Sequence, residues 1–225
     1  MAGTRPCRFF TVYIRCAVAY NAGTTYDTRL MHRTRYYSMG EQDVREALHD
    51  TVITQLYYAD PVTRVIDEFV VEAGRHRVDV AAINGEMHAF EIKSANDTLD
   101  RLCEQQESYN KVFDRITLVV DERHVDEAVK LVQPWWGLTS VTRRDGKPVL
   151  DEIWRARPNF KQDAYALAQL LWREEALRIL EMHRLAVGMH RQTRKRMWQK
   201  LAREMPLQKL KTVVRQTLKY RKDWR

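Results

Sequence analysis

Two carboxylates and a lysine lie on either side of a short segment that is typical of a β-hairpin turn. Asp79 precedes the pair Asn84-Gly85, and Glu91 and Lys93 follow it. Because side chains alternate along a strand, Glu91 and Lys93 share one face. Two carboxylates on one face can bind a hard divalent cation, and a nearby lysine can stabilise developing negative charge. These residue types therefore predict a metal site suited to phosphodiester hydrolysis.

The length of the hairpin turn decides whether Asp79 and Glu91 meet. A two-residue turn would place them on opposite faces, because a shift of one residue inverts the faces of a strand. A three-residue turn Ile83-Asn84-Gly85, with Gly85 left-handed in a bulge, puts them on one face. We expect that turn or an equivalent bulge. On the opposite face we expect a core of Val78, Val80, Ala82, Phe90 and Ile92.

The apolar periodicity predicts a mixed α/β chain that can position these side chains. A cap at Asp97 or Thr98 is expected to begin the helix that follows the hairpin. We expect strands at 63–71, 76–83, 87–93, 116–120, 136–143 and 149–154. We expect helices at 41–56, 99–113, 125–132, 163–183, 193–205 and 207–220.

The net charge of +8 on the 225 residues is unevenly distributed. Residues 183–225 hold 14 Lys and Arg residues and two acidic residues, whereas residues 39–182 carry a net charge of −9. Such a basic end is typical of proteins that bind a polyanion, most often nucleic acid. Phosphate contacts are expected from Arg194, Lys195, Arg196 and Lys200. A solvated helical face and a contact with a protein partner are the alternatives.

Cysteine usage and hydropathy indicate the compartment. The three cysteines form no C-x-x-C pair, which argues against a zinc finger or a disulfide scaffold and favours a reducing environment. No apolar run approaches the roughly 18–20 residues of a membrane span. The apolar run 9–14 is too short for a signal peptide. We therefore expect a cytoplasmic protein with no membrane partner.

The ordered motifs of the chain resemble those of a known family. An Asp, then Glu-x-Lys, on a hairpin is the signature of the PD-(D/E)XK nuclease superfamily, and further motifs are similar to its small bacterial and phage "sce-type" family. The resemblance runs from about residue 40 to about residue 222. The motifs include Glu68-Phe69, Arg77-Val78-Asp79, Phe90-Glu91-Ile92-Lys93-Ser94, Gln105, Tyr109, Trp135-Trp136-Gly137-Leu138, Arg157-Pro158-Asn159 and Arg194-Lys195-Arg196.

The resemblance implies a restriction-endonuclease-like mixed sheet flanked by helices, with an all-helical basic C-terminal region. It also implies a Mg²⁺-dependent hydrolase, a deoxyribonuclease, in which Mn²⁺ substitutes for Mg²⁺. In such an enzyme Asp79 and Glu91 bind the metal and Glu68 completes its shell. Lys93 is then the catalytic lysine, and Gln105 supports the site.

Three parts of the chain are expected on this basis. They are a poorly ordered N-terminal extension at 1–38, with Met39 a candidate natural start, a PD-(D/E)XK nuclease-like core at 39–160, and the helical basic region at 161–225. The alternative function is a nucleic-acid-binding module with little catalysis that acts with a repair or phage-defence partner. A homodimer is a further candidate assembly. DNA is the expected nucleic acid.

Several residues have a second interpretation. Glu46 is a rival to Glu68 as the upstream acidic residue. Asp79, Glu91 and Lys93 could instead form an ion pair on a solvated strand face, which is worth about 0–1 kcal/mol. For Tyr109, packing in the core is the preferred interpretation. Packing is likewise preferred over base stacking for the pair Trp135-Trp136.

Overall fold

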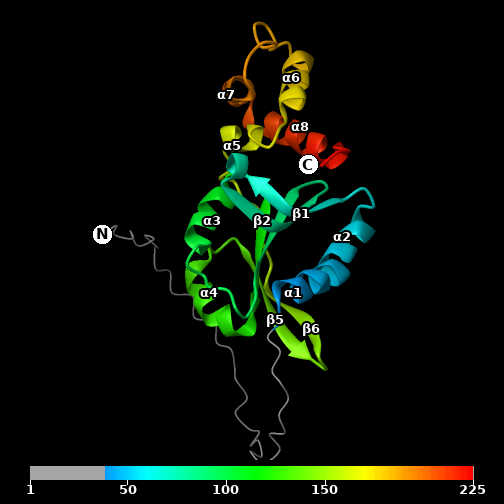
Figure 1. The fold of residues 1–225 in the computed structure, drawn as a ribbon, viewed down its shortest axis with the longest axis vertical. Coiled ribbons are helices and arrows are strands. Elements are labelled where there is room, and N and C mark those ends of the chain that lie inside the picture. Colours follow the sequence, from blue (N-terminus) through cyan, green and yellow to red (C-terminus); the bar gives the residue numbers. More distant parts are fainter. Residues whose placement is uncertain (1–38, 225) are drawn as a thin grey trace, which may run out of the picture. The chain divides into compact units, whose positions relative to one another are not determined.

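The computed structural model describes residues 39–224, and the chain from Met39 onward forms one compact unit. Its centre is a six-stranded sheet in the order β1-β2-β3-β4-β5-β6 (Figure 1). β4 runs parallel to both β3 and β5, and the other neighbours are antiparallel, which confirms the α/β class with a mixed sheet. The strands are β1 Arg64–Val71, β2 His76–Ile83, β3 Met87–Lys93, β4 Arg115–Asp121, β5 Gly137–Arg144 and β6 Lys147–Trp154. The predicted extension 1–38 lies outside the described residues.

Helices cover both faces of the sheet (Figure 1). On one face, α1 Glu41–Leu48 and α2 Thr54–Ala59 close a core that contains Val44, Leu48 and Phe90. On the other, α3 Leu102–Asn110 and α4 Val125–Leu131 close a larger core that contains the fully buried Tyr109 and Trp136. The preference for packing at Trp135-Trp136 agrees with this burial of Trp136.

The predicted apolar face of the hairpin is confirmed for Val80, Ala82, Phe90 and Ile92, which share one core, but not for Val78. Val80 joins the core under α1, but Val78 joins the core under α3, so the facing of β2 changes at Asp79. Glu91 and Lys93 are 2% and 7% exposed, and they lie under α3 with the buried Ala81 and Ala89. The carboxylates therefore lie inside the molecule, where burial changes their chemistry.

The turn between β2 and β3 has the expected parity but different residues. Ile83 pairs with Met87, and Val80 pairs with Phe90, so the loop consists of residues 84–86. The backbone N–H of Asn84 bonds to the carbonyl of Glu86 at 3.0 Å, and no left-handed Gly85 is found in this loop. The same register, continued by one residue, brings Asp79 opposite Glu91.

The predicted helix at 41–56 contains a change of pitch. A π-helical segment, η1 His49–Ile53, separates α1 from α2. The wider turn changes which carbonyls accept backbone bonds, and threonine side chains bond to two of them. Thr51 Oγ1 donates to the carbonyl of Ala47 at 2.7 Å, and Thr54 Oγ1 donates to that of His49 at 2.9 Å.

The predicted helix at 163–183 is wrong, because it is two helices, α5 Ala164–Ala168 and α6 Arg173–Met182. Side chains distant in sequence donate hydrogen bonds to the backbone carbonyls between the two helices. Arg221 donates to the carbonyl of Leu170 at 3.0 Å, and the Trp198 indole donates to that of Leu171 at 3.0 Å. Tertiary partners thus stabilise a break that apolar periodicity does not reveal.

The remaining elements follow the predictions with small changes at their ends. The β5–β6 hairpin and the basic helices α7 Arg194–Glu204 and α8 Leu207–Tyr220 are present. The helix α3 begins later than expected, and Asp97 does not cap it. Instead, Asp97 accepts hydrogen bonds from the backbone and hydroxyl of Ser94 at 2.7 and 2.6 Å. Between residues 39 and 224, no helix is long and apolar enough to cross a membrane.

Candidate functional site

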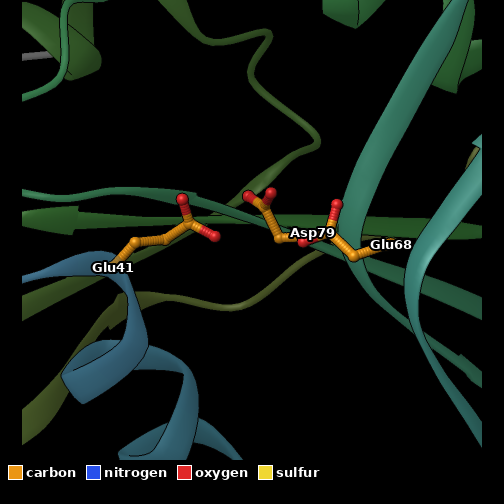
Figure 2. A group of neighbouring side chains, drawn as sticks. All are labelled: Glu41, Glu68 and Asp79. Carbon is orange, nitrogen blue, oxygen red and sulfur yellow. The ribbon is translucent and has the colours of Figure 1, made fainter.

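Three carboxylates converge where the start of α1 lies beside the middle of β1 and β2 (Figure 2). One oxygen each of Glu41, Glu68 and Asp79 lies within 4.8 Å of the others. They come from α1, β1 and β2, respectively. We call these three residues the acidic cluster. Hard divalent cations such as Mg²⁺ and Ca²⁺ take carboxylate oxygens as ligands, so the donor set fits such an ion.

The local backbone explains why Glu68 meets Asp79. The β1–β2 register pairs Asp67 with Val80 and Phe69 with Val78, which leaves Glu68 opposite Asp79. Glu68 has a left-handed backbone, with φ at 57°, and this interrupts the ladder at that point. A non-glycine residue in this conformation is uncommon and is often found at a functional position.

Arg77 forms an ion pair with Glu68, and Arg45 supplies further counter-charge to the acidic cluster. The guanidinium of Arg45 forms ion pairs with Glu41 and Glu68 and lies 3.9 Å from a carboxylate oxygen of Asp79. Burial alone would lower the pKa of Arg45, but the hydrogen bonds to Glu68 and Glu41 raise it overall. The guanidinium therefore stays charged beside the carboxylates, and a divalent cation would have to displace or share it.

Asp79 is the most perturbed member of the cluster. Burial, and then the nearby charge of Glu91, raise its pKa to about 7. A hydrogen bond from the backbone N–H of Ile92, at 2.6 Å, acts in the opposite direction. A bound cation would favour the ionised form, since it neutralises the charge that burial penalises.

Glu91 occupies the centre of a buried hydrogen-bond network. Lys93 Nζ lies 2.7 Å from Glu91 Oε1, and the Gln105 amide donates to the same oxygen. The hydroxyl of Tyr109 lies 2.9 Å from Glu91 Oε2. Burial and the charge of Glu91 raise the pKa of Tyr109, so its hydroxyl stays protonated as a donor. Both carboxylate oxygens of Glu91 therefore have protein partners, whereas Asp79 faces the acidic cluster.

The predicted site residues thus fall into two connected groups. Asp79 and Glu68 are brought together, and Lys93 and Gln105 are gathered around Glu91. The metal and catalytic roles proposed for them stay predictions. Gln105 keeps one buried oxygen, Oε1, without a hydrogen-bond partner among the described residues.

Sequence reasoning missed Glu41 and Arg45 and proposed Glu46 as a rival to Glu68. In the structure, Glu46 accepts a hydrogen bond from Gln42 at 2.9 Å on the exposed side of α1, outside the cluster. Glu41 and Arg45 form a spacing of four residues on α1, which is the only signal available in the sequence. That spacing is common on solvated helices, so it does not by itself indicate a site.

The cations of the two last helices differ in their partners. On α8 and just after it, Lys211 and Arg215 lie beside Asp114, Lys219 pairs with Asp60, and Arg221 pairs with Glu175. On α7, no acidic partner in residues 39–224 contacts the four cations that were predicted to bind phosphate. We call these four the α7 cations: Arg194, Lys195, Arg196 and Lys200.

A cavity of about 380 Å³ borders both the acidic cluster and the α7 cations. Glu68 and other β1 residues form one wall, and Arg194 and Trp198 of α7 form part of another. Arg196 and Lys200 line a separate shallow pocket of about 300 Å³ on α7. A negatively charged ligand along α7 would therefore pass close to the acidic cluster.

Comparison with known proteins points to a different family from the one that the motifs resemble. The family model of bacteriophage P4 protein cII matches residues 35–224. Protein cII of Enterobacteria phage P4 is 26% identical over 183 residues, which are 80% of this chain and 67% of that relative. No solved structure matches this chain, so the restriction-endonuclease-like fold stays a prediction.

These matches overturn the nuclease interpretation. The family that matches residues 35–224 is not the PD-(D/E)XK superfamily, and the name of the relative, protein cII, states no enzymatic activity. The predictions of a nuclease, a hydrolase and a deoxyribonuclease are therefore wrong. The alternative of a nuclease-like module with a repair or phage-defence partner gains no support either. A short carboxylate–lysine motif occurs in unrelated chains, and the match over residues 35–224 carries more weight. The chain belongs to the bacteriophage P4 protein cII family.

Proposed function

We propose that this protein binds DNA, with the phosphate backbone on α7 and a Mg²⁺ ion at the acidic cluster. The observation that carries the proposal is the cavity whose walls contain both Glu68 and Arg194. Mg²⁺ is commonly bound by one or two carboxylates together with phosphate oxygens. An ion at Glu41, Glu68 and Asp79 would therefore link the acidic cluster to a phosphate held by Arg194. The proposed activity is binding, and no bond is broken.

The α7 cations supply the electrostatic part of the proposal. Exposed Lys and Arg residues that lack acidic partners lose little when they approach phosphate, and the released counterions favour binding. Their contacts would be independent of base sequence, because phosphates carry no sequence information. Lys211, Lys219 and Arg221 contribute less, since their acidic partners already neutralise them.

The first test measures DNA affinity by fluorescence anisotropy across a range of salt concentrations. Replacing Lys195, Arg196 and Lys200 by Ala should weaken binding and reduce the salt slope by about one for each lost phosphate contact. The control is Lys130→Ala, which removes one exposed cation from α4, far from α7 (Figure 1). Equal salt slopes for the triple variant and the wild type would exclude α7 as the phosphate-binding surface.

The second test addresses the metal. Mn²⁺ titration followed by electron paramagnetic resonance should show a site in the wild type that is lost in Glu41→Gln/Glu68→Gln. The control is Glu46→Gln, which removes one acidic charge from the same helix outside the cluster. Mg²⁺ should tighten DNA binding at constant ionic strength in the wild type and in the control only. A Mg²⁺ effect that persists in the double variant would refute the metal site.

A further inference from the structure

We propose that the cavity between β1 and the C-terminal helices takes an unpaired base of single-stranded DNA. The inference rests on the proposed DNA binding and specifies the form of DNA that is bound. Glu68 and Phe69 of β1, Trp172 before α6, Arg194 and Trp198 of α7, and Trp224 near the C-terminus line this cavity. A volume of about 380 Å³ lies within the range of sites that hold a small organic group, which is about 300–1,000 Å³.

Flat cationic and aromatic groups are concentrated around the cavity. The Arg194 guanidinium carbon lies 4.6 Å from the centre of the Trp198 ring. The guanidinium carbon of Arg221 lies over the rings of Trp172 and Trp224, at 4.3 and 4.5 Å from their centres. Tryptophan rings and guanidinium planes are the groups on which single-stranded bases stack in proteins. The cavity therefore offers a base flat groups to stack on and the positive charge of Arg194.

Two sets of polar groups at the cavity need partners. The indole Nε1 of Trp224 is buried and has no hydrogen-bond acceptor in the part of the chain that the structure describes. In addition, β1 is an edge strand, so backbone groups along one of its sides pair with no other strand. The carbonyl and amino groups of a base could pair with the free backbone groups of β1, which apolar ligands could not do.

The size and walls of the cavity favour single-stranded DNA over a duplex. Bases in a duplex are stacked on their neighbours, so their faces are closed to a protein unless they are unpaired or flipped out. A cavity of this volume, with β1 on one side and helices on the other, admits an isolated base and excludes a double helix. The adjacent Arg194 can then contact the phosphate of the same strand.

The experiment compares three probes with the full chain by anisotropy: a short oligothymidylate, an abasic oligonucleotide with the same number of phosphates, and a duplex of equal length. The oligothymidylate should bind about 5-fold or more tightly than the abasic strand, because one stacked base contributes about that factor. It should also quench tryptophan fluorescence, whereas the abasic strand should not.

A substitution then tests the position of the base. Arg194→Lys replaces a flat guanidinium by a compact ammonium, so the preference for oligothymidylate over the abasic strand should fall. Lys130→Ala should leave this preference unchanged. Equal affinity for the two single strands, or tighter binding of the duplex, would overturn the inference while DNA binding stands. Failure of all three probes to bind would overturn the proposed function as well.

Discussion

The helices α7 and α8 are similar in basic composition and differ in what their cations contact. Lys211, Lys219 and Arg221 lie against acidic residues of the folded body, and all three side chains are less than 15% exposed. The α7 cations Lys195 and Arg196 are exposed and contact no acidic residue between positions 39 and 224. One set of cations attaches α8 and Arg221 to neighbouring segments of the fold, and the other is available to a ligand.

This difference shows that the charge of a segment does not identify a binding surface. A cation that already has a buried acidic partner stabilises the fold, and DNA could recruit it only by breaking that pair. A cation without a partner remains hydrated and can exchange water for phosphate. Stability and affinity measurements on paired variants should therefore separate the two helices.

The largest effect is expected from Arg221→Ala. This change removes a buried partner of Glu175 and the bond to the carbonyl of Leu170. Breaking a buried ion pair typically costs about 3–5 kcal/mol of the free energy of unfolding, because the remaining charge is left unpaired. Urea denaturation measures the loss. Unfolding at the same urea concentration as the wild type would contradict a structural role for this residue.

Asp79→Asn should instead raise the free energy of unfolding. The pKa of Asp79 is about 7 in the folded protein and 3.8 in the unfolded reference, so the folded state holds this proton more tightly. The resulting stabilisation is complete below about pH 4 and is lost as the pH rises through 7. Without divalent cations, Asp79→Asn should therefore raise the free energy of unfolding by about 1–3 kcal/mol at pH 8.

The measurement for Asp79→Asn is urea denaturation at several pH values in the presence of a chelator. The asparagine oxygen can still accept the bond from the N–H of Ile92, so the local geometry is retained. The fall in stability of the wild type between about pH 4 and pH 8 should become shallower in the variant. Parallel profiles for the two proteins would show that Asp79 does not cause the pH dependence.

Lys211→Ala is expected to have a smaller cost. Lys211 lies 2.8 Å from Asp114, which also accepts a 2.8 Å bond from the backbone N–H of Met87 and stays partly bonded after the change. We expect a loss of about 1 kcal/mol in the free energy of unfolding, because the pair is partly solvated. The same urea titration checks it. A stability equal to that of the wild type would weaken the contrast between α8 and α7.

The smallest stability effect is expected from Lys195→Ala/Arg196→Ala. Exposed residues without partners usually change the free energy of unfolding by less than about 0.5 kcal/mol. Denaturation should therefore match the wild type, while the DNA-binding salt slope falls. A marked loss of stability would mean that these two cations support the fold, and the contrast with α8 would disappear.

The predictions from sequence were strongest where neighbouring residues decide the structure. The hairpins, the buried strand β4 and the helices α7 and α8 follow from apolar periodicity and turn residues. The even parity predicted for the hairpin, which places Asp79 and Glu91 on one face, agrees with the observed register, although the turn is formed by residues 84–86. The sequence did not predict that Glu91 and Lys93 are buried, because their burial depends on α3, which lies elsewhere in the chain.

The site was only partly predictable for the same reason. Glu68 and Asp79 were identified as candidates, but Glu41 and Arg45 join them only because α1 begins beside β2. The break between α5 and α6 depends on Trp198 and Arg221, which lie 27 and 51 residues along the chain from the carbonyls that they bond to.

Residue types and their periodicity therefore established the α/β class, the acidic candidates and the basic end of this chain. Folding decided which charges are paired and which remain free. The physical reason is that the energy of a charged group depends on its burial and its neighbours, and distant segments provide both. The last 43 residues contain 14 cations, and their spacing in the sequence does not distinguish Lys211 from Lys195. The two differ because folding places Asp114 beside Lys211.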